Sequence, residues 1–203
     1  HPGDAILMEP LAVVEAVGVF FGVIGVWLTI RQNIWCWPAG IVNVTLFLAV
    51  FFQARLYGAM ALQAVYLVLS LYGWYAWRDR GGERSSLTVR SIPRHWLGAL
   101  LTAGTAAGVL LGLFLDYRTD AALPYWDSVA TAFSLVAQGM TTRKWIENWI
   151  VWIAVDLVSV GMFLCQGLYP TAGLYLVFLS MAILGFREWK KSLRHDPIAR
   201  ERS

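Results

Sequence analysis

The sequence predicts an all-α membrane protein with seven transmembrane helices, because its composition, its apolar runs and the placement of its charges agree. Hydrophobic residues make up 58% of the 203 residues and charged residues only 14%, whereas a soluble domain carries roughly 25% charged residues. Apolar runs close to the roughly 18–20 residues that cross a bilayer recur along the chain. We expect spans at 11–30, 37–54, 57–77, 95–115, 126–142, 148–168 and 170–189.

Basic residues separate these spans and predict their orientation. If the spans alternate in direction, fourteen of the sixteen Lys and Arg residues fall on one side, and only Arg55 and Arg118 on the other. The positive-inside rule then places the N-terminus outside and the C-terminus in the cytoplasm. We therefore expect a cytoplasmic basic loop at 78–94 and a cytoplasmic tail at 190–203. The net charge of +3 is a sign of topology, and nucleic-acid binding explains it poorly.

An internal repeat relates the first three spans to the last three. One constant shift, which places Phe21 on Phe133, aligns them without a gap, and polar and aromatic residues recur in the same order. We call this pairing the repeat alignment. Shared apolar composition alone would give fewer identical pairs than the alignment shows. The identical pairs are Phe21/Phe133, Thr29/Thr141, Arg31/Arg143, Ile34/Ile146, Trp37/Trp149, Ile41/Ile153, Phe51/Phe163, Leu56/Leu168, Tyr57/Tyr169, Leu62/Leu174, Val65/Val177, Leu67/Leu179, Gly73/Gly185 and Trp77/Trp189.

The fourth span has no counterpart in the repeat, and this predicts a 3+1+3 arrangement. A first three-helix repeat covers 11–77, a linker helix rich in small residues covers 95–115, and a second three-helix repeat covers 116–189. An odd number of spans inverts the direction of the chain, so the linker makes the two repeats parallel. Parallel repeats are typical of transporters that bind substrate between them near the bilayer midplane. The alternative is a duplicated scaffold without a pore.

Trp149, Trp152 and Asp156 form the main candidate site. Their spacings of three and seven residues place them along one stripe of a helix. A carboxylate at membrane depth costs about 2.5–3.5 kcal/mol unless it faces a cavity or a partner, and two indole faces can hold a flat cation. We therefore expect an aromatic cation to bind here. Trp149 could instead be an interfacial anchor. Asp156 could be a structural hydrogen-bonding partner for Asn43, Gln63 or Gln138, and without a basic partner it would carry a proton or bind a cation.

The repeat is asymmetric at this site, which suggests space for a ligand. Trp37 and Gly40 correspond to Trp149 and Trp152, so one repeat offers a gap where the other offers an indole. Hydrogen bonds to a ligand are expected from polar side chains at similar depth, although each can instead join helices. These polar residues are Asn43, Gln63, Gln138 and Asn148.

Enzyme activity is not expected from this sequence. His1, His95 and His195 all lie outside the spans or at their ends, and the motifs HExxH, CxxC and the Walker loop are absent. Asp156 is the only convincing acid in the middle of a span, whereas an aspartyl protease needs two. We expect no cofactor and no metal site.

These residues resemble the PnuC family of bacterial vitamin transporters, which carry nicotinamide riboside. The resemblance depends on the pattern Glu147-Asn148-Trp149-x-x-Trp152-x-x-x-Asp156, on Trp37-x-x-Gly40-x-x-Asn43 and on the 3+1+3 plan, and it covers about residues 13–191. It implies a SWEET-like fold in the bacterial inner membrane, homotrimers and facilitated diffusion. It also implies that a cytoplasmic riboside kinase traps the substrate by phosphorylation.

Within this family, the residues favour nicotinamide riboside as the substrate. It is a planar pyridinium cation with a carboxamide and a ribose, which matches two indoles, one acid and several amides. Thiamine, another aromatic cation, is the next candidate, and neutral riboflavin gains less from Asp156. We expect alternating access without ion coupling, with proton coupling through Asp156 as the alternative. A sugar transporter of the same architecture and a non-transporting scaffold or receptor are the remaining hypotheses.

Overall fold

The computed structural model describes residues 2–53, 55, 57–78, 87–118 and 123–195. Several predicted segments fall partly outside these ranges, the basic loop and the tail most of all. About half of the expected basic loop at 78–94 lies in 79–86, and most of the expected tail at 190–203 lies in 196–203.

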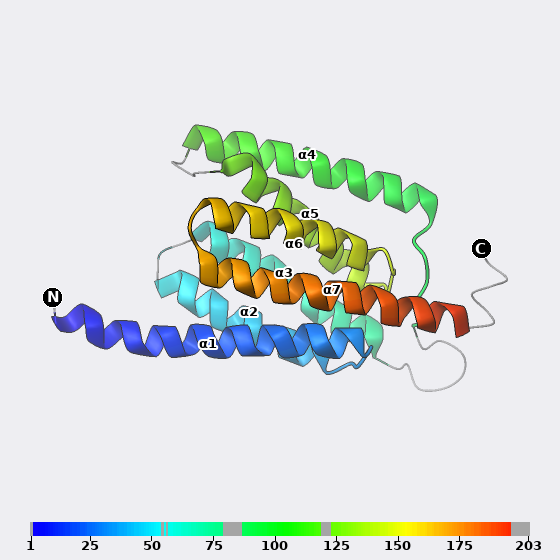
Figure 1. The fold of residues 1–203 in the computed structure, drawn as a ribbon, viewed down its shortest axis with the longest axis horizontal. Coiled ribbons are helices and arrows are strands. Elements are labelled where there is room, and N and C mark those ends of the chain that lie inside the picture. The colour runs from blue at the N-terminus through cyan, green and yellow to red at the C-terminus, as the bar shows by residue number, and fades with distance from the viewer. Residues whose placement is uncertain (1, 54, 56, 79–86, 119–122, 196–203) are drawn as a thin grey trace. The chain divides into compact units, whose positions relative to one another are not determined.

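The described residues form seven α-helices and no strand longer than a single β-bridge (Figure 1). The expected spans begin and end within a few residues of the observed helices, except that α1 begins earlier and α7 ends later. The helices are α1 (Pro2–Ile30), α2 (Cys36–Gln53), α3 (Tyr57–Trp77), α4 (Arg94–Arg118), α5 (Pro124–Thr142), α6 (Asn148–Cys165) and α7 (Tyr169–His195).

Six of these helices are long and apolar enough to cross a membrane, and α5 is the exception. The expected span at 126–142 is a helix of 19 residues, but polar residues lower its mean hydropathy. Several of them are buried, so the helix keeps them within the protein. These buried polar residues are Ser128, Ser134, Thr141 and Thr142.

The helices divide into two compact units, His1–Ser86 and Leu87–Ser203, here called unit 1 and unit 2. In unit 1, α2 packs against both α1 and α3. In unit 2, α6 packs against both α5 and α7, and α4 packs on α5. The helix predicted as a linker at 95–115 is therefore part of unit 2.

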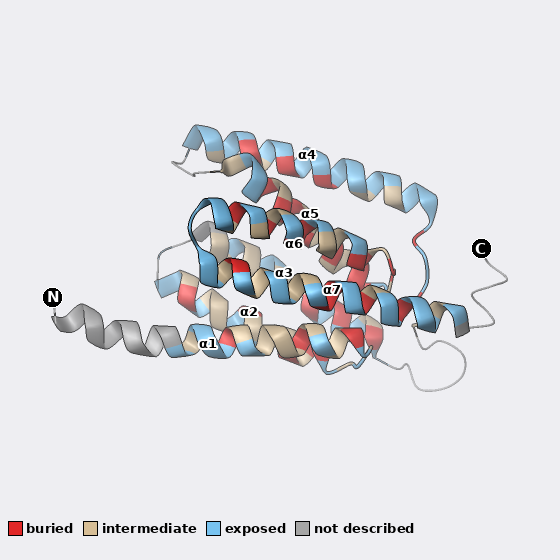
Figure 2. Cartoon of the chain, in the orientation of Figure 1, coloured by how far each residue is buried: buried red, intermediate tan, exposed pale blue. Residues whose placement is uncertain are grey.

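Three glycines hold α4 close to α5. Gly104, Gly108 and Gly112 are the buried residues of α4, and most of the remaining surface of this helix is exposed (Figure 2). A methyl group at Gly112 would lie 2.7 Å from Tyr125, and one at Gly108 would lie 3.2 Å from Val129. The spacing of four residues places the glycines on one face, where small residues let two helix backbones approach.

The helix ends of the two units match under the repeat alignment that the sequence predicts. Helices α2 and α6 coincide at both ends, α1 and α5 at their last residue, and α3 and α7 at their first. The turns match as well, because Gln32 and Lys144 have φ of 53° and 51°, and Arg55 and Gly167 have φ of 57° and 73°. Left-handed backbone at two corresponding points gives both units the same turns between helices.

Candidate functional site

The stripe predicted on α6 is present, and its three side chains differ in exposure. Trp149 is 2% exposed and Asp156 is 4% exposed, whereas Trp152 is half-buried. Asp156 lies at the middle of α6. The spacing therefore places the three residues on one stripe of α6, but it does not tell which of them pack inside unit 2.

Trp149 packs tightly between α6 and α7. Its ring lies against Gly185, where a methyl group would come within 2.6 Å of the indole. Its ring centroid is 5.4 Å from that of Trp189 at an interplanar angle of 89°, an edge-to-face arrangement that aromatic pairs favour. Much of the indole surface that we expected to face a ligand is thus in contact with α7, and substrate contact by Trp149 stays a prediction.

Unit 1 contains the same cluster. Trp37 is 3% exposed, its ring leaves no room for a methyl group on Gly73, and it meets Trp77 edge to face at 5.3 Å and 88°. We call Trp37/Gly73/Trp77 and Trp149/Gly185/Trp189 the two Trp–Gly–Trp clusters. Each joins the central helix of its unit to the next helix.

Trp152 and Gly40 make fewer contacts than the residues of these clusters. The Trp152 side chain makes no hydrogen bond or ring contact within the part of the chain that the structure describes. In unit 1, a methyl group at Gly40 would meet only the Ser70 hydroxyl, at 3.9 Å, an ordinary contact distance. Both positions therefore lack the tight ring contacts of the two Trp–Gly–Trp clusters.

Asp156 is buried at the middle of α6. Among the residues with described side chains it makes no hydrogen bond or ion pair, including to Gln138 in the same unit. The Tyr175 hydroxyl on α7 lies within electrostatic reach of both Asp156 and Asp127. An unpaired buried carboxylate is costly at membrane depth, so this arrangement favours either a proton or a cation at Asp156.

Two predicted amide ligands are engaged in packing. Asn148 is fully buried; its Nδ2 donates to the Trp145 carbonyl at 2.6 Å and its Oδ1 accepts from Thr141 Oγ1 at 3.2 Å. In unit 1, Asn43 Nδ2 donates to the Gly18 carbonyl at 2.7 Å and joins α2 to α1. Hydrogen bonds to backbone carbonyls occupy the Nδ2 group of both amides, so ligand contact by either stays a prediction. Gln63 and Gln138 are half-buried.

Tyr175 was missed from the sequence, although the repeat could have identified it. Under the repeat alignment it corresponds to Gln63, a polar residue within a span. Tyr175 is half-buried and contacts Phe163 at 5.2 Å and Phe178 at 6.0 Å. Applying the repeat to each candidate residue would have added this tyrosine.

The comparisons with known proteins agree with this architecture. The family model described as nicotinamide mononucleotide transporter matches residues 12–191. The nicotinamide riboside transporter PnuC of Escherichia coli (strain K12) is 30% identical over 209 residues, which covers 91% of this chain and 87% of the relative. The riboflavin/roseoflavin transporter RibM of Streptomyces davaonensis is 28% identical over 186 residues, which covers 90% of this chain and 86% of the relative.

A solved structure has the same fold. The chain described as the vitamin B3 transporter PnuC superposes with a TM-score of 0.72 at 23% identity and covers 96% of this chain and 88% of its own. The fold, the length of the family match and the relatives agree on a class of membrane transporters rather than enzymes. The chain is a multi-pass membrane protein that belongs to the PnuC family, which the nicotinamide mononucleotide transporter model describes.

Proposed function

We propose that this protein carries nicotinamide riboside across the bilayer. The observation that carries the proposal is Asp156, a carboxylate that is 4% exposed at the middle of α6 and that has no bonded partner among the described side chains. The pyridinium ring of the substrate is a cation and pairs with this carboxylate. Trp152, one helical turn away, offers an indole face for the same ring.

Further contacts to the ligand come from polar groups of unit 2. The Tyr175 hydroxyl, within electrostatic reach of Asp156, is placed to bond a ribose hydroxyl or the carboxamide. Gln138 is half-buried in the same unit. From unit 1, Gln63 and Gly40 stay expected contacts. Trp149, Trp37, Asn148 and Asn43 hold the helices that carry these groups.

The riboside suits this site better than its phosphorylated form. The middle of each expected span contains no Lys, Arg or His that could neutralise a phosphate, and Asp156 would repel it. This charge argument separates nicotinamide riboside from nicotinamide mononucleotide, although the family description names the nucleotide.

We also propose that the seven helices form two parallel repeats of three with α4 between them in sequence. The coinciding helix ends and left-handed turns under the repeat alignment support this. On this proposal α5 crosses the membrane as α1 does, with its polar residues facing protein. The N-terminus is outside, and the two repeats rock to expose the site alternately to each side.

Transport is facilitated diffusion in this scheme. Phosphorylation of the riboside by a cytoplasmic kinase then traps it, and the protein works as a homotrimer in the bacterial inner membrane. Purified protein in liposomes should therefore equilibrate labelled nicotinamide riboside without a pH gradient. Uptake that becomes concentrative with a proton gradient, and that a protonophore collapses, would replace uniport with proton coupling.

Riboflavin is the second candidate substrate, because the relative RibM is named for it. A thermal-stability panel separates the candidates, since a ligand that binds the folded state raises the unfolding temperature by mass action. The panel contains nicotinamide riboside, nicotinamide mononucleotide, nicotinamide, thiamine, riboflavin and sucrose. We expect the riboside to give the largest shift. A larger shift with riboflavin or sucrose, or no shift with any compound, would contradict the proposal.

A further inference from the structure

The segment before α4 is packed although it connects two helices. We call residues 87–93 the strap. Val89 is 3% exposed and Ile92 is 7% exposed, so two of its side chains reach the interior of unit 2. Ile92 packs in a small core with Met140 and Trp145. Burial of this kind fixes a segment against its neighbours.

Three hydrogen bonds join the strap to the turn between α5 and α6. Arg90 N donates to the Lys144 carbonyl at 3.1 Å, and Ile146 N donates to the Arg90 carbonyl at 3.0 Å, which makes a parallel bridge between Arg90 and Trp145. Ile92 N donates to Glu147 Oε2 at 2.9 Å. The third bond is the only one of the three that a side chain makes.

Glu147 directly precedes α6 but does not cap it. Its carboxylate instead accepts the strap amide. The next residue, Asn148, binds back to Trp145 and Thr141. The start of α6 is therefore held from two directions, by the strap through Glu147 and by the turn through Asn148.

The corresponding turn of unit 1 is closed in a different way. Under the repeat alignment, Glu147 corresponds to Trp35, which is 66% exposed. Asn33 Oδ1 accepts a hydrogen bond from Trp35 N at 3.0 Å, so this turn is satisfied by its own side chain. The carboxylate that binds a strap belongs to the α6 turn, next to the stripe that contains Trp152 and Asp156.

We propose that Glu147 is a positioning residue: its carboxylate holds the strap by the hydrogen bond from Ile92 N and thereby sets where α6 begins. We call this hydrogen bond the latch. The latch ties the α6 stripe to the strap and, through it, to α4. Its consequence for substrate affinity rests on the proposed transport function. Glu147 itself touches no substrate and acts through the helix that it precedes.

The direct test is hydrogen exchange of the strap in the full-length protein in nanodiscs. Glu147→Ala removes the acceptor, and we expect the peptide that covers the strap to exchange about tenfold faster or more, because a hydrogen bond to a charged group is lost. Glu147→Gln keeps an acceptor oxygen and should retain most of the protection. Unchanged strap exchange in Glu147→Ala would overturn the proposal.

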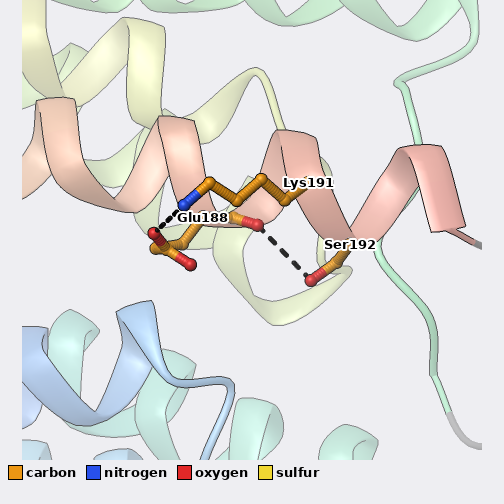
Figure 3. Close-up of polar contacts among 3 residues, drawn as sticks. All are labelled: Glu188, Lys191 and Ser192. Atoms are coloured by element: carbon orange, nitrogen blue, oxygen red, sulfur yellow. Dashed lines mark hydrogen bonds and ion pairs between the residues drawn. The ribbon is translucent and has the colours of Figure 1, made fainter.

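Glu188→Ala is the matched control for loss of an acid. Glu188 is exposed on α7, where Lys191 Nζ donates to its carboxylate at 2.7 Å and the Ser192 hydroxyl donates to its backbone carbonyl at 3.4 Å (Figure 3). A surface pair of this kind contributes little to stability. Strap exchange should therefore stay at the wild-type rate in this variant. An equal rise of the strap exchange rate in Glu147→Ala and Glu188→Ala would show a general loss of stability and overturn the proposal.

A transport readout separates positioning from a purely structural role. We expect Glu147→Ala to raise the half-saturation concentration for nicotinamide riboside several-fold, Glu147→Gln to restore it, and Glu188→Ala to leave it unchanged. If Glu147→Ala speeds exchange of the strap but leaves the half-saturation concentration for nicotinamide riboside unchanged, Glu147 has no role in positioning the site. If the wild-type protein carries no riboside, the proposed function fails, while the exchange result still decides whether the latch exists.

Discussion

At the scale of residues, members of one helix stripe do different work. Trp149 and Trp152 both lie on the Asp156 side of α6, but Trp149 is 2% exposed against Gly185 and Trp189, whereas Trp152 is half-buried without a ring partner in the described part of the chain. We infer that Trp149 maintains the packing of α6 on α7 and that Trp152 contacts the ligand.

Alanine variants of the two tryptophans should separate these roles. Trp149→Ala removes a buried aromatic ring and should lower the free energy of unfolding by about 3–5 kcal/mol. Trp152→Ala should cost much less stability but weaken binding of nicotinamide riboside about tenfold, because a cation–π contact is lost. Trp37→Ala is the control for Trp149→Ala, since it removes the same cluster from unit 1. Equal loss of stability in Trp149→Ala and Trp152→Ala would contradict the assignment.

Tyr175 should contribute a hydroxyl rather than bulk. Tyr175→Phe keeps the contacts with Phe163 and Phe178 and removes only the hydroxyl, which interacts electrostatically with Asp156. We expect an unchanged unfolding temperature and an affinity for nicotinamide riboside that is several-fold weaker, as for loss of one hydrogen bond. Isothermal titration measures the affinity, and a wild-type value would remove Tyr175 from the proposed site.

At the scale of elements, the two Trp–Gly–Trp clusters join α2 to α3 and α6 to α7. Each depends on a glycine that lets a large indole lie against a helix backbone. The same contact in both units indicates that each helix pair is held in one register. Ridge-and-groove packing alone tolerates more variation than this.

Glycine-to-alanine variants test these contacts with a control on the same helix. Gly185→Ala and Gly73→Ala place a methyl group inside an indole ring's contact distance and should destabilise the protein by about 1–3 kcal/mol through overpacking. Gly173→Ala on α7 meets nothing within 4 Å and should be neutral or slightly stabilising, because alanine favours helix. Thermal unfolding in detergent measures all three. A stable Gly185→Ala variant would show that the indole can move aside.

The sequence predicted the helices well and the direction of their side chains poorly. Apolar length and the charges between runs determine where a membrane helix begins and ends, so α2, α3 and the start of α6 were predicted nearly to the residue. In an apolar helix, however, lipid-facing and protein-facing residues look alike. The burial of Trp149 therefore could not be predicted, nor could the bond from Asn43 to the Gly18 carbonyl.

At the scale of the whole molecule, the two units share helix ends and left-handed turns but differ at their candidate ligand positions. Unit 2 offers Trp152 and Asp156 where unit 1 has Gly40 and Val44 under the repeat alignment. The strap and Glu147 also belong to unit 2 alone. We infer that duplication supplied the scaffold and that the charge-bearing part of the substrate is bound mainly by unit 2.

The most direct test of this account is the affinity of nicotinamide riboside for the wild-type protein and for Asp156→Asn, measured by titration on purified protein. The substitution keeps the size of the side chain and removes its charge. We predict roughly 10- to 100-fold weaker binding of the cationic riboside, because a charge-assisted contact in a low-dielectric site is lost, with the unfolding temperature of the free protein maintained or raised. Undiminished affinity in Asp156→Asn would contradict the central role of this carboxylate.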